Sequence, residues 1–194
     1  FREFLAWIVE ANKLFVIIGN MNSIIYKEIF PLIKNNKMWL GNGFHAGNAF
    51  FSTPTTKDYA EGVYNPETGL VKFRNCCWFT NLDHGRRHQP LPLMTMRDNL
   101  KFSKHKEIKG KKSYSEYDNY EAIEVPYTDA IPSDYDGVMG VPVSFLEKYN
   151  PDQFEILGSN RGVDQDPNKI YGRGSYLNGK EVYKRLFIRY KARN

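Results

Sequence analysis

Lys13-Leu-Phe-Val-Ile-Ile-Gly-Asn-Met-Asn22 is the stretch of sequence that decides the fold. Its apolar run has no polar alternation and ends at a glycine. This pattern predicts a strand over residues 14–18 that is buried on both faces, as parallel strands of α/β sheets are. Apolar residues then recur at helical spacing and predict a helix over residues 23–35, with Ser23 as its N-cap and a kink or break at Pro31. Ligands of α/β sheets bind where such a strand turns into its helix.

Asn20 and Asn22 lie in that turn and allow two interpretations. Their side chains can border a functional site at the end of the strand. They can also form an Asx turn and cap the helix, which is the commoner role of asparagine at such a place. Local chemistry favours the cap.

Composition places the chain among ordinary folded proteins. Its 194 residues, 41% of them hydrophobic, suffice for one domain or for one and a part of another. Cys76 and Cys77 are adjacent and unsuited to a mutual disulfide, which favours a reducing, cytoplasmic location. No apolar run is long enough to cross a bilayer, and no signal peptide opens the chain, so we expect no membrane association.

The first ten residues form an amphipathic helix without a capping residue or a preceding strand. A helix that leads straight into a buried parallel strand implies a βαβ unit whose first strand is missing. We therefore expect the chain to be a fragment that begins just after a functional loop.

The rest of the chain is rich in predicted strands. Asn178-Gly179 is typical of a type I′ hairpin turn, whereas the Pro- and Gly-rich segment 131–145 makes a poor helix. The expected strands cover residues 37–41, 70–74, 76–81, 121–125, 154–158 and 181–191.

Positive charge is concentrated between His84 and Lys112. This segment has nine Lys or Arg and two acidic residues, a net charge of +7, whereas the remainder has 18 basic and 20 acidic residues, a net charge of −2. Such a run is typical of a segment that binds a polyanion. The alternative is a solvated surface run, and residues 101–112 could be a disordered loop. In that case the next candidate for a DNA surface is the C-terminal hairpin around Lys184, Arg185 and Arg189.

The chain lacks the common catalytic and metal-binding motifs. His84 and His88 are four residues apart, but no Cys or carboxylate completes a zinc site in the sequence pattern, and we expect no metal. The acid pairs Asp134/Asp136 and Asp164/Asp166 stand among turn residues, where solvated acids are the commoner explanation. The residues alone indicate an incomplete α/β domain with a basic extension. Nucleic acid is its natural partner, and the reaction stays open.

Several blocks of sequence, in order through most of the chain, resemble one enzyme family. The chain is similar in these blocks to the EcoRI-type adenine-specific DNA methyltransferases. The blocks are Phe1-Arg-Glu-Phe-Leu5, Phe15-Val-Ile-Ile-Gly-Asn-Met-Asn-Ser-Ile-Ile-Tyr-Lys-Glu-Ile-Phe-Pro-Leu-Ile33, Met38-Trp-Leu-Gly41, Trp78-Phe-Thr-Asn-Leu-Asp-His84, Tyr135-Asp-Gly-Val-Met-Gly-Val-Pro142 and Phe145-Leu-Glu-Lys-Tyr-Asn-Pro-Asp-Gln-Phe-Glu-Ile-Leu-Gly158.

The resemblance implies methyl transfer from S-adenosyl-L-methionine to N6 of an adenine in double-stranded DNA. It implies residues 1–83 as the late half of a Rossmann-like methyltransferase sheet, with strand 14–18 parallel inside it and strands 38–41 and 76–80 toward its edge. Residues 84–194 would be a mostly β, basic target-recognition region. The family's Asn/Asp-Pro-Pro-Phe/Tyr catalytic loop is absent here, so the chain has no expected catalytic residue and is expected to be inactive alone.

The resemblance also assigns residues to sites. Phe1 and Phe4 would flank the cofactor, and a flipped adenine would meet a pocket in which asparagine can pair with the adenine edge. The expected target-base pocket consists of Asn20, Asn22, Trp78, Phe79 and Asn81. The expected DNA-binding residues are Arg86, Arg87, Arg97, Lys101, Lys104, Lys106, Lys109, Lys111 and Lys112. No obligate protein partner is inferred, and a non-catalytic nucleic-acid-binding module, or less readily a restriction-type nuclease, remains the alternative.

Overall fold

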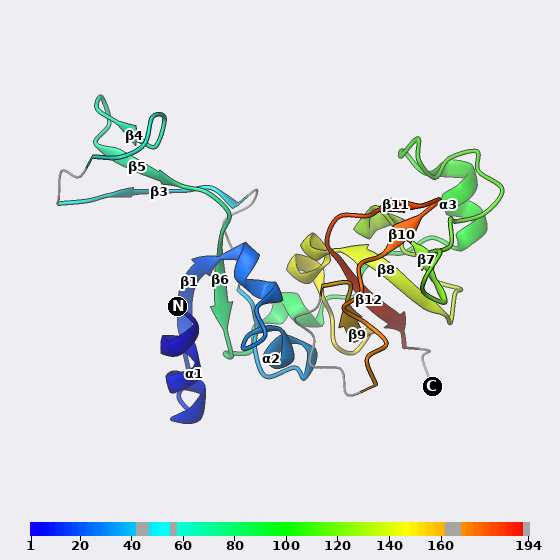
Figure 1. The fold of residues 1–194 in the computed structure, drawn as a ribbon, viewed down its shortest axis with the longest axis horizontal. Coiled ribbons are helices and arrows are strands. Elements are labelled where there is room, and N and C mark those ends of the chain that lie inside the picture. Colours follow the sequence, from blue (N-terminus) through cyan, green and yellow to red (C-terminus); the bar gives the residue numbers. More distant parts are fainter. Residues whose placement is uncertain (42–46, 55–57, 162–167, 192–194) are drawn as a thin grey trace.

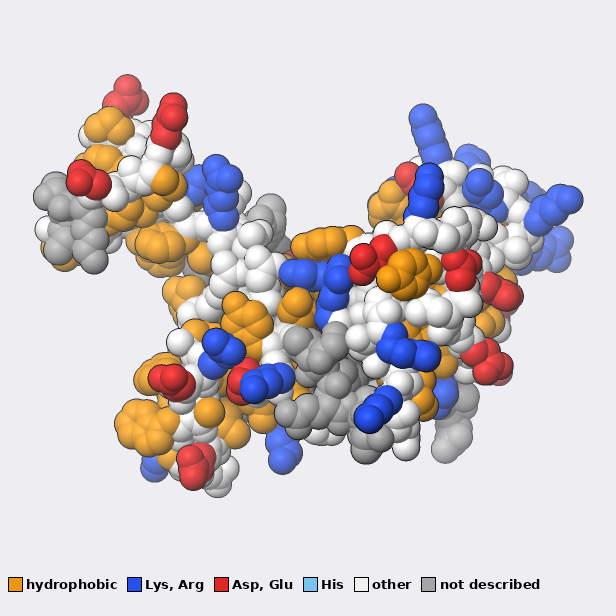
Figure 2. Space-filling view, in the orientation of Figure 1, with side chains coloured by type: hydrophobic (Ala, Val, Ile, Leu, Met, Phe, Trp, Pro, Cys, Tyr) orange, Lys and Arg blue, Asp and Glu red, His pale blue; other side chains and the backbone are white. Residues whose placement is uncertain are grey.

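A computed structural model describes residues 1–41, 47–54, 58–161 and 168–191. Three parts follow one another across the long axis of the molecule (Figure 1). We call residues 1–41 and 76–83 the N-terminal part, residues 47–75 the arm, and residues 84–191 the C-terminal lobe. The arm projects from the N-terminal part, and a hollow separates it from the C-terminal lobe (Figure 2).

The N-terminal part contains a three-stranded sheet beside helix α1 (Arg2–Glu10). Its strands are β1 (Val16–Asn20), β2 (Trp39–Leu40) and β6 (Cys76–Thr80), in the order β1-β6-β2, and both pairs are antiparallel. The expected parallel neighbours of strand 14–18 are therefore wrong for the described residues, and β6 is central rather than at the edge. The expected burial of this strand on both faces is also wrong for the described residues, because none of the five β1 residues is buried and Val16 is 54% exposed. The apolar run likewise does not indicate the direction of the neighbouring strand.

The expected helix over residues 23–35 is two short helices. A 3₁₀ helix η1 (Met21–Ile25) begins directly after β1, and α2 (Phe30–Lys34) follows with Pro31 in its first turn. Asn20, not Ser23, is the N-cap of η1, because its Oδ1 accepts a hydrogen bond from the Asn22 amide at 2.8 Å. The break near Pro31 is confirmed, since proline suits the first turn of a helix and not its interior.

The arm is a small antiparallel sheet with its own buried residues. Strands β3 (Ala49–Ser52), β4 (Tyr64–Asn65) and β5 (Leu70–Phe73) pair in the order β3-β5-β4. Ala49 and Val71 of this sheet are buried. The strand predicted over residues 70–74 is confirmed here, while the glycine-rich residues 42–46 lie outside the described part of the chain.

The C-terminal lobe is built on a four-stranded sheet of order β7-β8-β12-β9. The strands are β7 (Ala122–Glu124), β8 (Val138–Pro142), β9 (Phe154–Ser159) and β12 (Arg185–Tyr190), and β7 and β8 are parallel. The hairpin of β10 (Tyr176–Leu177) and β11 (Lys180–Glu181) turns at Asn178 and Gly179, whose φ angles of 50° and 76° confirm the predicted turn. Sequence patterns did not predict β8, which has Gly and Pro within it.

Short helices complete the lobe: η3 (Gly85–His88), α3 (Met96–Phe102), η4 (Thr128–Ala130) and η5 (Val143–Lys148). Residues 101–112 are folded rather than disordered, because Ile108 is 3% exposed and belongs to the main core. That core extends from Leu5 of α1 to Ile188 of β12, so the N-terminal part and the C-terminal lobe share one hydrophobic cluster. Among the described helices, none has the length and apolar character that a bilayer crossing requires.

Candidate nucleic-acid interface

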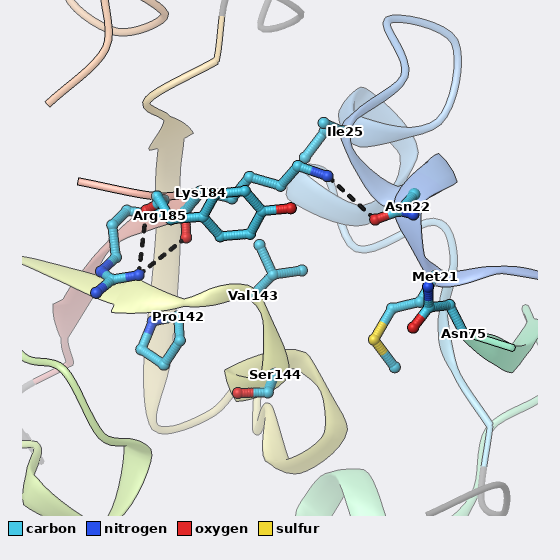
Figure 3. A pocket seen from close by; sticks show the side chains of 10 residues that line it. Met21, Asn22, Ile25, Asn75, Pro142, Val143, Ser144, Lys184 and Arg185 are labelled. Atoms are coloured by element: carbon cyan, nitrogen blue, oxygen red, sulfur yellow. Dashed lines mark hydrogen bonds between the residues drawn. The ribbon is translucent and has the colours of Figure 1, made fainter. Parts of the chain in front are cut away.

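A groove of about 370 Å³ lies between the N-terminal part and the C-terminal lobe. Figure 3 shows its walls coming from segments far apart in the sequence. One wall consists of η1 and the turn before β6, and the other consists of the end of β8, the first residues of η5 and the segment that leads into β12. The lining residues are Met21, Asn22, Ile25, Asn75, Pro142, Val143, Ser144, Tyr183, Lys184 and Arg185.

One hydrogen bond crosses the groove. The Nζ of Lys184 donates to Oδ1 of Asn22 at 3.1 Å (Figure 3), and both side chains are partly or fully open to solvent. An ammonium group and an amide therefore converge on one point from two parts of the protein. Both groups can exchange this bond for one to a ligand, because both are accessible to solvent.

A buried ion pair fixes the wall that carries Lys184. Glu124 is 7% exposed and accepts hydrogen bonds from Nε of Arg185 at 3.0 Å and from its Nη2 at 2.6 Å. The hydroxyl of Tyr117 donates to the same carboxylate. Burial alone would lower the pKa of Arg185, but the hydrogen bonds and charge of Glu124 outweigh burial and raise it. Arg185 therefore remains a fixed cation beside the groove.

Of the five residues expected in the target-base pocket, only Asn22 lines the groove. Asn20 caps η1, so the cap interpretation of its side chain is confirmed. Asn81 has a structural role, because its side chain connects the end of β6 to the segment before β1. It accepts a hydrogen bond from the Phe15 amide and donates one to the Lys13 carbonyl, each at 2.9 Å. Phe79 is fully buried in the core, and Trp78 is half-buried on β6 outside the groove lining.

Phe1 borders a different cavity, whereas Phe4 does not line it. Phe1 is 42% and Phe4 is 50% exposed, and the Phe1 ring lies 5.4 Å from that of Phe79. Phe1, Arg2, Glu3, Ala6 and Glu28 line a cavity of about 490 Å³. Oε2 of Glu28 is buried there and finds no hydrogen-bond partner among the described residues. A buried carboxylate oxygen without a partner beside an exposed aromatic ring is a chemically incomplete arrangement.

The basic segment contains one buried arginine, Arg87, one half-buried arginine, Arg86, and seven exposed cations. Arg87 is 8% exposed, lies 3.5 Å over the Trp39 ring, and binds Asp83 and Asn36. Its guanidinium therefore holds the N-terminal part to the lobe, and we leave it out of the candidate interface. Lys104 binds Asp129 at 2.7 Å. The exposed cations around and after α3 gather at the far end of the lobe (Figure 2): Arg97, Lys101, Lys104, Lys106, Lys109, Lys111 and Lys112.

His88 connects the N-terminal part to the C-terminal lobe. Its Nε2 lies 2.8 Å from Asp83 after β6, and its Nδ1 lies 3.3 Å from Asp152 of the lobe. The hydrogen bonds to Asp83 and then to Asp152 raise the pKa of His88, while desolvation and the charge of nearby Arg87 oppose this shift. The hydrogen bond from His88 likewise leads the causes that lower the pKa of Asp83.

We expect His88→Gln to destabilise the protein more at pH 5.5 than at pH 8.5. A raised pKa in the folded state means that protonated His88 stabilises the fold fully below its unfolded pKa of about 6.5 and loses this effect as pH rises through the folded pKa. Asp83 is ionised at both pH values. Thermal melting of the wild type and the variant at the two pH values measures the difference. Equal differences in melting temperature would contradict an ionic bridge.

Sequence reasoning missed Tyr183, Ser144 and Asn75, and it placed Lys184 and Arg185 only in a second choice of DNA surface. The three missed residues come from separate parts of the chain: Asn75 just before β6, Ser144 in η5 and Tyr183 just before β12. No local pattern marks them, because the groove exists only after the two parts pack together.

The comparisons with known proteins agree with one another. A family model described as adenine-specific methyltransferase EcoRI matches residues 1–191. The type II methyltransferase M.EcoRI of Escherichia coli is 42% identical over 180 residues, 91% of this chain and 52% of that protein. Type II methyltransferases of Mycoplasma genitalium and Mycoplasma pneumoniae are 33% and 32% identical, covering 97% and 81% of this chain and 61% and 47% of their own lengths. The chain thus spans about half the length of these relatives. No solved structure matches it.

Proposed function

Because this chain belongs to the EcoRI-type family of adenine-specific methyltransferases, we propose that it forms the DNA-recognising part of a site-specific DNA methyltransferase. The whole enzyme would transfer a methyl group from S-adenosyl-L-methionine to N6 of an adenine in double-stranded DNA. The relatives are type II methyltransferases, the modification enzymes of restriction-modification systems. The groove between the N-terminal part and the C-terminal lobe is the proposed place of the target base.

The hydrogen bond between Lys184 and Asn22 across the groove is the observation that carries this proposal. A lysine ammonium binds phosphate oxygens, and an asparagine amide can pair with N6 and N7 of adenine. Here the two groups lie 3.1 Å apart in a groove of about 370 Å³. An adenine must leave the duplex stack before its N6 can react, so a groove beside the bound backbone is needed to hold it.

The cavity beside Phe1 is the proposed contact of this chain with S-adenosyl-L-methionine. The exposed ring of Phe1 suits the flat adenine of the cofactor, and Oε2 of Glu28 lacks, among the described residues, a partner that a ribose hydroxyl or an ammonium group could supply. Phe4 is exposed on the same helix but does not line the cavity. The residues present thus fit part of the cofactor. The cofactor supplies the electrophilic methyl group, and this chain would orient its adenine end.

We also propose that the remaining sequence of the whole enzyme packs on β1. Among the described residues, β1 pairs with β6 alone. Leu14 is 74% and Val16 is 54% exposed at this free edge, and Trp7 of α1 is 67% exposed. Native proteins cover apolar strand edges of this kind. A further strand here would complete the sheet that the family resemblance implies.

Methyl transfer by an assembled enzyme tests the proposed function. This chain, fused to the part of M.EcoRI that lies outside the match, would be incubated with labelled S-adenosyl-L-methionine and unmethylated bacterial DNA. We expect N6-methyladenine among the released nucleosides, and none from this chain alone. DNA binding without any transfer by the fusion would favour a non-catalytic binding module instead.

Substitutions at Asn20 and Asn22 distinguish a residue that binds the target base from one that only caps a helix. In the fusion, Asn22→Ala should lower turnover by about 5- to 150-fold if its amide pairs with adenine. Asn20→Ala should cost about 1 kcal/mol of stability through loss of the η1 cap and leave turnover nearly intact. Turnover assays and thermal melting of both variants provide the comparison. A larger loss of turnover in the Asn20 variant would remove Asn22 from the site.

A further inference from the structure

Tyr183 has the largest exposed fraction of the described tyrosines. Its side chain is 69% exposed in the groove, whereas Tyr114, Tyr117, Tyr120 and Tyr149 are all buried. A tyrosine left open to solvent in a groove offers a flat apolar face at a small cost in conformational entropy. Exposure by itself does not identify a binding site, because Trp7 of α1 is equally exposed.

The backbone that carries Tyr183 is held rigidly. Nη1 of Arg185 donates to the Tyr183 carbonyl at 3.1 Å and to the Lys184 carbonyl at 3.2 Å. The other guanidinium nitrogens bind Glu124, which is buried. Arg185 thus holds the backbone of the two residues before β12 in place. A side chain presented in this way binds a ligand with little further loss of freedom.

Two cations flank the ring of Tyr183. Nζ of Lys184 lies 5.4 Å and Cζ of Arg161 lies 5.9 Å from the ring centroid. Arg161 also binds Glu181 at 3.0 Å, and its buried Nε has no hydrogen-bond partner among the described residues. A flat ring with two cations close to it fits a ligand that is flat in one part and anionic in another. A nucleotide has this combination.

We propose that Tyr183 stacks on a nucleobase of bound DNA, while Lys184 and Arg161 hold the adjoining phosphates. This inference rests on the proposed function and adds a residue and a contact type to it. Stacking on tyrosine is insensitive to base identity, since every base has a flat face. Tyr183 would therefore hold an unpaired base in the groove, and Asn22 on the opposite wall would read its edge.

Binding to a short single-stranded oligonucleotide tests the proposal without knowledge of the recognition sequence. We expect Tyr183→Ala to weaken binding by about 5- to 150-fold, the range for one stacked base. Tyr183→Phe keeps the ring and should bind like the wild type. Tyr183→Leu keeps apolar area without the ring and should resemble the alanine variant. Tyr64→Ala, which removes a tyrosine 42% exposed on the arm, is the matched control and should change little.

Photocrosslinking identifies the contact directly. An oligonucleotide with one 5-iodouracil should crosslink to Tyr183, as located by mass spectrometry of the digested protein, and the crosslink should vanish in Tyr183→Ala. Wild-type affinity in Tyr183→Ala, or a crosslink elsewhere with none at Tyr183, would overturn the stacking role and leave the proposed function standing. Absence of binding to any DNA by the wild-type protein would overturn both.

Discussion

Arg185→Met is expected to destabilise the protein by about 3–5 kcal/mol. The substitution removes the partner of Glu124, whose side chain is 7% exposed and lies against the hydroxyl of Tyr117. A carboxylate left buried without its cation costs far more than the pair contributes, because desolvation is no longer offset. Urea unfolding followed by tryptophan fluorescence measures the loss as a shift in midpoint.

A second pair on the same strand provides the control. Arg189 of β12 lies 3.9 Å from Glu155, but their side chains are 49% and 52% exposed. Arg189→Met should therefore cost less than about 1 kcal/mol. The double variant Arg185→Met, Glu124→Leu should recover much of the stability lost by Arg185→Met alone, because no unpaired charge then stays buried. A double variant as unstable as the single one would refute this account.

Arg185→Met should also affect the groove. Arg185 donates hydrogen bonds to the carbonyls of Tyr183 and Lys184, so its loss frees the backbone that presents both side chains. The stable double variant should thus still bind DNA less tightly than the wild type. This separates the contribution of Arg185 to the groove from its contribution to stability.

Local sequence patterns predicted the pieces that depend on neighbouring residues. The first helix, strand 70–74, the turn at Asn178-Gly179 and the break near Pro31 each have a local cause in periodicity, positive φ or a missing amide. The direction of β1 has no local cause. Phe15 is buried and Val16 is exposed at the edge, so the apolar run reflects burial on one side and, on the other, an edge that described residues do not cover.

The candidate interface was predicted even less completely, and for a related reason. Charge counting finds residues that are close in sequence, and it included Arg87, which is buried against Trp39. It could not find Asn22 and Lys184 as a pair, since 162 residues separate them in the chain. Asn20 and Asn22 illustrate the same limit. Both are asparagines of one turn, yet the side chain of Asn20 caps η1 and that of Asn22 lines the groove, and residue type alone does not distinguish the two positions.

The last prediction concerns the exposed lysines after α3. Replacing Lys106, Lys109, Lys111 and Lys112 with Ala should flatten the dependence of log affinity on log salt by up to about 3.6, if all four contact phosphate. All four side chains are exposed at the far end of the lobe. Binding to random-sequence duplex DNA over a range of salt concentrations measures the slope. The loss should be alike for any duplex, because phosphate contacts position DNA without specifying its sequence.

A control with the same change in net charge distinguishes local contact from overall charge. Replacing Arg2, Lys13, Lys27 and Lys37, all in the N-terminal part, removes four positive charges as well. If the lysines after α3 bind phosphate, only their loss should flatten the slope strongly. The slope reflects the number of counterions released from DNA, and this number depends on the phosphates contacted rather than on the net charge of the protein. Equal slopes in the two quadruple variants would mean that these lysines are merely solvated. The electrostatic contact would then rest on the groove itself, where Lys184 and Arg161 flank Tyr183.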